Sequence, residues 1–269
     1  MGKRFVCFKS VLIILLFCSF GAVLGAQQPS QAEQLRILIW SSIDPFPGSF
    51  DEPEGTDKDA VLKKTAARQA SATAAAVASP AVSPDDPYVA EKLEVFGYAI
   101  ERTKEITPFL LSGMISGWAF DYVPYDKTRR VQEIFEVEEV TPFSAAMNPI
   151  SYKNPEPLEN RLVCWAYCDR TEAQQLSYRR WTSVQLPKIH GKGAASVEGE
   201  FEGIQAACKE AVKNAVREYW RIYEKNKPKE ILGKVLLIGN PRIYISEGQY
   251  VADLEFFLET DRIVKYTTY

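Results

Sequence analysis

The sequence lacks the short motifs that mark many nucleotide-binding and hydrolytic sites. It has no phosphate-binding loop, no dinucleotide fingerprint, no His-Glu-x-x-His and no Gly-x-Ser-x-Gly elbow. Its single histidine, His190, lies in the glycine-containing stretch 187–196, which we expect to form a loop. A histidine without a neighbouring nucleophile signature is typical of an exposed side chain, so no catalytic residue is predicted.

Cysteine is scarce, and its spacing argues against both a disulfide framework and a metal site. Two of the five cysteines fall within the first 26 residues, which leaves Cys164, Cys168 and Cys208, an odd number. On a strand over 161–169, Cys164 and Cys168 share a face but lie about 13 Å apart, too far for a bridge. A bridge to Cys208 stays open, although buried free thiols are favoured. A site built from these thiolates and His190 is disfavoured because the strand separates the sulfurs, so we expect no metal and no cofactor.

The N-terminus has the three parts of a secretory signal. Basic residues come first, residues 11–20 are predominantly apolar, and residues 21–26 are mostly small. The apolar run is shorter than the roughly 18–20 residues of a membrane-spanning helix, so cleavage after Gly25 or Ala26 is favoured over a retained anchor. Lipidation of a cysteine in the leader is a further alternative. We therefore predict that residues 1–26 are a signal peptide and that the protein is exported, periplasmic or envelope-associated.

Loss of the leader makes the chain more acidic. It removes three of the 32 basic residues and none of the 35 acidic ones, which changes the net charge from −3 to −6. An acidic protein does not attract DNA, RNA or anionic lipid through its overall field. We therefore expect no nucleic-acid partner, and membrane contact only through the leader or an uncleaved anchor.

Composition divides the rest of the chain into three parts. Residues 27–50 hold a short β-rich segment, Leu35–Trp40, followed by turn residues. Residues 51–84 are rich in alanine, serine and proline and almost free of large apolar side chains, which predicts a flexible linker. Residues 85–269 have the alternating and helical periodicities of a globular domain.

The folded region predicts an α+β architecture. We expect a mainly antiparallel sheet with two main helices packed on one face. A helix followed by a hairpin recurs at 88–140 and 201–258, which suggests a repeated unit. The expected helices cover 87–113, 171–181 and 201–222, and the expected strands cover 118–123, the end of 129–140, 161–168, 234–238, 242–246 and 250–258.

An aromatic strand running into an acidic turn is the candidate binding site. Trp118 and Tyr122 alternate on one face of the strand, Tyr125 follows in the turn, and Asp121 and Asp126 add negative charge. Such a surface suits a glycan or a peptide, provided that Trp118 and Tyr122 are exposed. The rival hypothesis is an envelope polysaccharide hydrolase, in which the two aspartates act as paired carboxylates.

Basic residues also recur along the last expected helix. They are spaced every fourth residue and interleaved with glutamates, so intrahelical ion pairing is favoured over partner binding. The residues are Lys209, Lys213, Arg217, Arg221 and Lys225.

One segment carries a family resemblance. Gly117-Trp-Ala-Phe-Asp-Tyr-Val-Pro-Tyr-Asp-Lys-Thr-Arg-Arg130 resembles uncharacterised exported proteins of spirochaetes, over residues 87–140 and part of the C-terminal region. The resemblance implies a periplasmic or envelope location and transfers no activity and no functional residues. Our hypothesis is an exported, non-catalytic envelope protein that binds or assembles with an envelope component, a protein or a glycan. A structural subunit that self-associates through Leu35–Trp40 is the third alternative.

Overall fold

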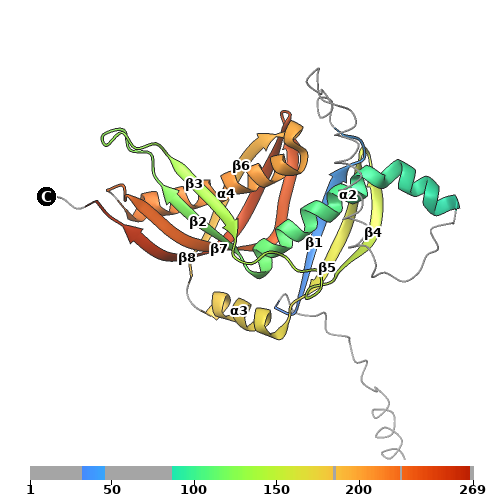
Figure 1. Ribbon diagram of the computed structural model, residues 1–269, viewed down its shortest axis with the longest axis horizontal. Coiled ribbons are helices and arrows are strands. Elements are labelled where there is room, and N and C mark those ends of the chain that lie inside the picture. The colour runs from blue at the N-terminus through green and yellow to red at the C-terminus, as the bar shows by residue number, and fades with distance from the viewer. Residues whose placement is uncertain (1–31, 46–86, 184–185, 225, 267–269) are drawn as a thin grey trace, which may run out of the picture. The chain divides into compact units, whose positions relative to one another are not determined.

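The computed structural model describes residues 32–45, 87–183, 186–224 and 226–266, whose strands form two antiparallel sheets (Figure 1). The α+β class is confirmed, with the strands divided between two sheets where the sequence predicts one. The three-stranded sheet has the order β1 (Gln34–Ser42), β5 (Arg161–Asp169), β4 (Ile150–Leu158). The five-stranded sheet has the order β3 (Ile134–Glu139), β2 (Trp118–Val123), β7 (Glu230–Ser246), β8 (Gln249–Val264), β6 (Lys188–Ser196). The helices are α2 (Pro87–Ile115), α3 (Glu172–Ser183), the short 3-10 helix η1 (Val197–Gly199) and α4 (Glu200–Tyr223).

Strand β1 belongs to the same fold as the C-terminal region. It pairs with β5 along its whole length, and its alternating side chains Ile37 and Ile39 are buried. On the other side of β1, the backbone N–H of Leu38 donates to the side chain of Asn240 at 3.1 Å. Strand β1 therefore pairs within its own chain. The predicted signal peptide and the predicted linker lie outside the described residues.

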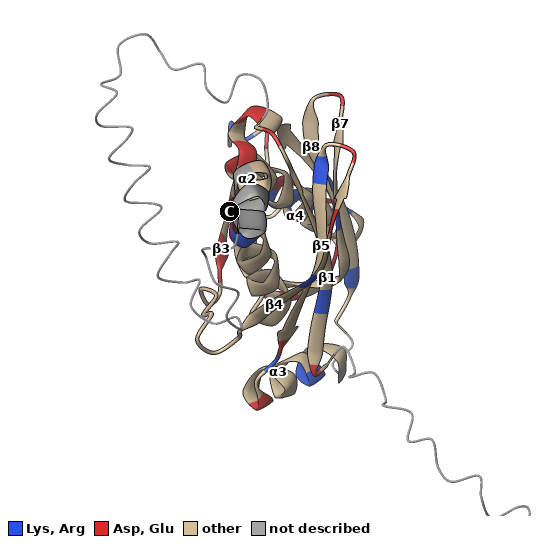
Figure 2. Ribbon diagram, turned by 90° about the vertical axis from the view of Figure 1, so that its right-hand side faces the viewer, with Lys and Arg blue, Asp and Glu red and all other residues tan. Residues whose placement is uncertain are grey.

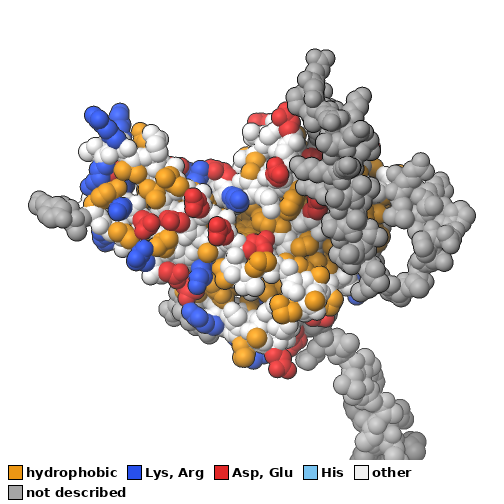
Figure 3. Space-filling view, in the orientation of Figure 1, with side chains coloured by type: hydrophobic (Ala, Val, Ile, Leu, Met, Phe, Trp, Pro, Cys, Tyr) orange, Lys and Arg blue, Asp and Glu red, His pale blue; other side chains and the backbone are white. Residues whose placement is uncertain are grey.

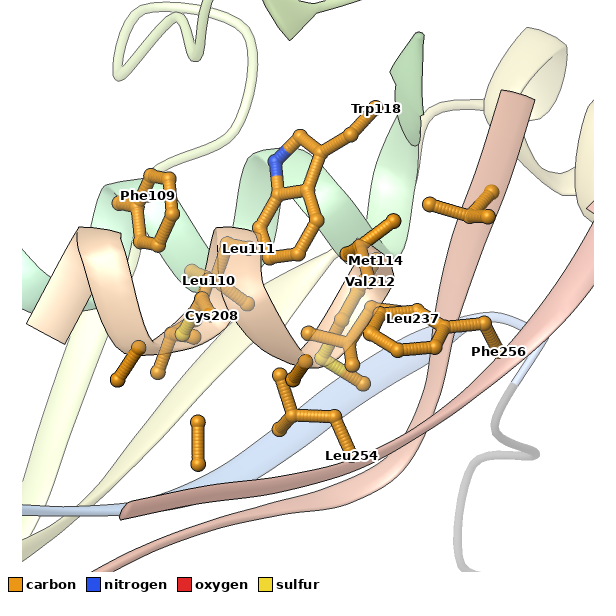
Figure 4. Close-up of a cluster of buried hydrophobic side chains, with 14 of the residues drawn as sticks. Phe109, Leu110, Leu111, Met114, Trp118, Cys208, Val212, Leu237, Leu254 and Phe256 are labelled. Atoms are coloured by element: carbon orange, nitrogen blue, oxygen red, sulfur yellow. The ribbon is translucent and has the colours of Figure 1, made fainter. Parts of the chain in front are cut away.

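Helix α2 contacts both sheets and contributes many of the core side chains. It packs on β1 and β5 in one sheet and on β7 in the other. Trp118 of β2 stacks on Phe109 of the helix at a ring-centroid distance of 5.0 Å and passes over Gly113, where a Cβ would collide with the indole (Figure 4). The helix continues through Pro108 and ends at Ile115, close to the predicted end at Gly113. Side chains of both sheets thus share one core.

Helix α4 lies directly on β6 because two glycines of the strand leave no side chain between them. A Cβ at Gly191 would lie 2.0 Å from the carbonyl oxygen of Ala211, and one at Gly193 would lie 2.3 Å from that of Ala207. Residues 187–196 were predicted to form a loop, and this prediction is wrong. Glycine serves close packing of a helix on a strand here, rather than a turn.

Helices α2 and α4 lie on the same side of β7 and β8 (Figure 2), as the expected one-sided packing requires. On the opposite face of the five-stranded sheet, Trp181 of helix α3 packs on Leu236 and Phe257. Within the described part of the chain, no helix has the length and apolar character needed to cross a membrane.

A helix followed by a hairpin does occur twice. Helix α2 leads into β2 and β3, while α4 leads into β7 and β8, and β2 lies beside β7 in the sheet. The predicted turn between Ser246 and Gln249 is confirmed, with positive φ at both Glu247 and Gly248. The two strands expected at 234–238 and 242–246 form the single strand β7, with a register shift between Ile238 and Arg242.

Candidate functional site

Two of the five predicted site residues are part of the hydrophobic core. Trp118 and Tyr122 are buried on the inner face of β2. The hydroxyl of Tyr122 donates to the Glu133 carboxylate at 2.9 Å, and burial together with that carboxylate raises the pKa of the phenol. Asp126 is buried as well, at 5% exposure, so the predicted surface retains the partly exposed Asp121 and the exposed Tyr125.

The carboxylate of Asp126 holds the turn that follows β2. It accepts hydrogen bonds from the backbone N–H groups of Thr128 and Arg129 at 2.9 and 3.1 Å, and from the Arg129 guanidinium at 2.5 Å. The hydrogen bonds from Arg129, with that from Thr128, lower the pKa of Asp126. An acid held in its ionised form by turn contacts suits a structural role better than proton transfer.

The carboxylate of Asp121 has a different environment. It lies directly opposite Glu136 on β3, on the strand face away from Tyr122. Its Oδ1 is buried without a hydrogen-bond partner among the described residues. Burial raises the pKa of Asp121, and Glu230 and Glu136 add to the effect. Asp121 therefore lies near the carboxylates of Glu136 and Glu230, whereas Asp126 is bonded within the turn, so the two aspartates have different environments.

Tyr125 is exposed, at 47%, and contacts Lys227 in the segment that follows α4. The Lys227 ammonium donates to the Tyr125 carbonyl at 2.7 Å and lies 5.7 Å from the ring centroid. Residues far apart in sequence therefore share one surface at this end of the five-stranded sheet.

The apolar stripe of α4 extends beyond the sheet that buries it. Ala215 and Val216 are fully buried, whereas Ile222 and Tyr223 are 73% and 63% exposed although they continue the same helical face. The rings of Tyr219 and Tyr223 lie 4.8 Å apart. We call this surface the aromatic–basic end, and it comprises Tyr125, Tyr219, Trp220, Ile222, Tyr223 and Lys227. Figure 3 shows basic and hydrophobic side chains gathered at this end, on the left of the view.

The helical periodicity of residues 201–222 does not show that the last two members of this stripe are exposed. The available signal was composition, because Ile222 and Tyr223 stand in a segment, 217–229, that is otherwise dominated by charge. Whether the sheet extends far enough to cover the end of the helix depends on the tertiary structure, which the local sequence pattern does not show.

Intrahelical pairing of the basic residues on α4 is confirmed for two of them. Lys213 bonds to Glu210 and Arg221 bonds to Glu218, each at 2.7 Å with three-residue spacing. Lys225 lies outside the described residues.

The three cysteines are buried and the histidine is exposed, so they do not form one site. Cys164, Cys168 and Cys208 are buried free thiols, and burial raises their pKa values to about 11, 11 and 12. His190 is exposed on β6, where its Nε2 lies 2.5 Å from a carboxylate oxygen of Asp253. No group of three or more His, Cys, Asp or Glu residues within the described ranges is placed to hold a metal ion.

Three small cavities lie between the elements, with volumes of about 10, 20 and 20 Å³. Each has room for about one water molecule. The first lies where β1, α2 and α4 meet, beside an ion pair between Arg102 and Glu200 with an N–O distance of 3.1 Å. None of the three includes a residue of the aromatic–basic end, which is an open surface.

Comparison with known proteins places the chain in a family. An uncharacterised protein of Treponema pallidum (strain Nichols) is 28% identical over 169 residues, which cover 63% of this chain and 71% of the relative. No solved structure matches. A family model matches residues 21–266, most of the chain. The resemblance to uncharacterised spirochaete proteins is thereby supported, and the chain belongs to an uncharacterised family of spirochaete proteins.

Proposed function

We propose that this protein is exported and acts in the cell envelope by binding or assembly, without catalysis, and that the aromatic–basic end is its binding surface. The observation that carries the choice of surface is the exposed end of the α4 stripe. Two neighbouring large side chains, Ile222 and Tyr223, at 73% and 63% exposure form an exposed apolar patch of the kind that marks interaction sites.

The charge–apolar–small order of residues 1–26 supports export. The separate environments of Asp121 and Asp126 support binding over the hydrolase alternative, because that mechanism requires two carboxyl groups to flank one bond. The pairing of β1 with β5, and the contact of Leu38 with Asn240, count against self-association through β1.

Cell fractionation followed by mass determination of the intact protein tests this proposal. We expect a chain that begins near Gln27 and is recovered with the periplasmic or envelope fraction. Recovery of the full chain in the cytosol, with Met1 still present, would refute export.

The choice of surface is tested in the same cells with two single variants. Ile222→Asp places a charge on the aromatic–basic end, and Leu176→Asp places one on α3, at a residue that is 64% exposed. We expect only Ile222→Asp to reduce retention of the protein in the envelope fraction. Equal behaviour of the two variants would contradict a binding role for this end.

A further inference from the structure

We propose that the aromatic–basic end docks on an anionic lipid surface. This inference rests on the proposed function, because it names the partner of the same surface. It differs from the expectation that an acidic protein is not attracted to anionic lipid, because that expectation rests on the net charge of the whole chain and not on the charge of this end.

The charge of this end is opposite to that of the chain. The described residues of segments 124–133 and 217–229 include seven basic and four acidic ones, a balance of +3, whereas the whole chain has a net charge of −3. The two segments are neighbours in space, since the Lys227 ammonium donates to the Tyr125 carbonyl and the Arg217 guanidinium lies 4.0 Å from the Glu133 carboxylate. A local excess of positive charge attracts an anionic surface at short range even when the protein is acidic overall.

Apolar and aromatic side chains lie among these cations. Ile222 and Tyr223 are exposed on the last turn of α4, while Tyr219 and Trp220 beside them are partly buried against the core, with their rings 5.1 Å apart. Tyrosine and tryptophan favour the boundary between lipid headgroups and acyl chains, where their rings are buried and their polar atoms stay hydrated. A helix end with this composition matches the interfacial contact of a peripheral membrane protein.

The shape of the end favours lipid over a protein partner. None of the three cavities described above involves it, and its most exposed side chains project outward. A protein partner of a projecting surface has to supply a matching pocket, whereas a lipid surface adapts to the side chains that enter it. Charge and exposure therefore point to one occupant, a bilayer that contains acidic headgroups.

The proposal is tested by sedimentation with vesicles, using the protein as processed by the cell. Phosphatidylcholine vesicles are compared with vesicles of phosphatidylcholine and phosphatidylglycerol. We expect binding to the anionic vesicles only, and weaker binding at high salt. Ile222→Asp should weaken binding about tenfold or more, and Arg221→Gln about fivefold.

Two controls match these variants. Leu176→Asp places a charge on α3 at a similarly exposed aliphatic residue, at 64% exposure. Arg242→Gln removes a cation whose side chain is 74% exposed, as is that of Arg221, and which is also paired with a carboxylate. Both controls should bind anionic vesicles as the wild type does.

Equal binding to neutral vesicles, or equal losses in the controls, would overturn the proposal. Absence of vesicle binding, with reduced envelope retention of Ile222→Asp in cells, would replace lipid with an acidic protein partner and leave the proposed function intact. An uncleaved chain in the cytosol would remove the proposed function itself, whatever the vesicles show.

Discussion

Replacement of Gly191 by alanine tests how α4 is seated on β6. The new Cβ would lie 2.0 Å from the carbonyl oxygen of Ala211, 2.8 Å from the Cβ of Ala215 and 2.9 Å from its backbone nitrogen. Two of these atoms belong to the helix backbone, so no side chain can rotate away and the helix has to move by about 1 Å. Overpacking of this kind costs about 3 kcal/mol, the upper part of its usual range.

For a domain of this size, that cost lowers Tm by about 6–12 °C. Thermal and urea unfolding followed by circular dichroism measure it. Gly97→Ala is the matched control, because a Cβ at Gly97 meets nothing within 4 Å and alanine is the better helix former. The control should raise the free energy of unfolding by about 0.5–1 kcal/mol. Indistinguishable stabilities of wild type and Gly191→Ala would refute the close packing of helix and strand.

Three further substitutions or reactions probe the core and the former candidate site. Burial raises the pKa of Asp121 above its unfolded value, so its charge destabilises the fold as pH rises through that range. Asp121→Asn should therefore unfold at a higher urea concentration than the wild type at pH 7, and the gain should shrink as pH falls toward about 4 and vanish below it. Tyr122→Phe removes the hydrogen bond to Glu133 and should lower the free energy of unfolding by about 1 kcal/mol in the same urea assay. A variant more stable than the wild type would show that this hydrogen bond does not stabilise the fold. The buried thiol of Cys208, with a pKa of about 12, should stay unmodified by a thiol reagent at pH 8 until urea unfolds the protein, as peptide masses would show.

The elements with strong periodicity were predictable from sequence. The helix α4 and the strand β5 were both expected from the sequence, at 201–222 and 161–168, and β5 proves to be the middle strand of its sheet. Strand β6 was not predictable, because Gly191 and Gly193 carry no side chain and their role depends on a helix that follows in the chain. Strand β4 escaped prediction too, since Pro155 and Pro157 are unusual in strands and are accommodated here at a sheet edge beside a bulge.

The candidate site shows a different limit of sequence reasoning. Alternation correctly placed Trp118 and Tyr122 on one face of β2, but alternation does not say which face is buried. Their size favoured the core, because aromatic rings bury more apolar area than Ala119 or Asp121. Tyr125 stayed exposed because it lies beyond the end of the strand, and its contact with Lys227 is a tertiary one.

Hydrogen exchange of the native protein, with and without vesicles that contain phosphatidylglycerol, tests the role of the aromatic–basic end most directly. The backbone amides of Tyr219–Glu224 at the end of α4 should exchange more slowly when vesicles are present, because lipid contact suppresses fraying of the last turn. The amides of α3 should not change. Slower exchange in α3, or no change at the end of α4, would contradict docking through this surface.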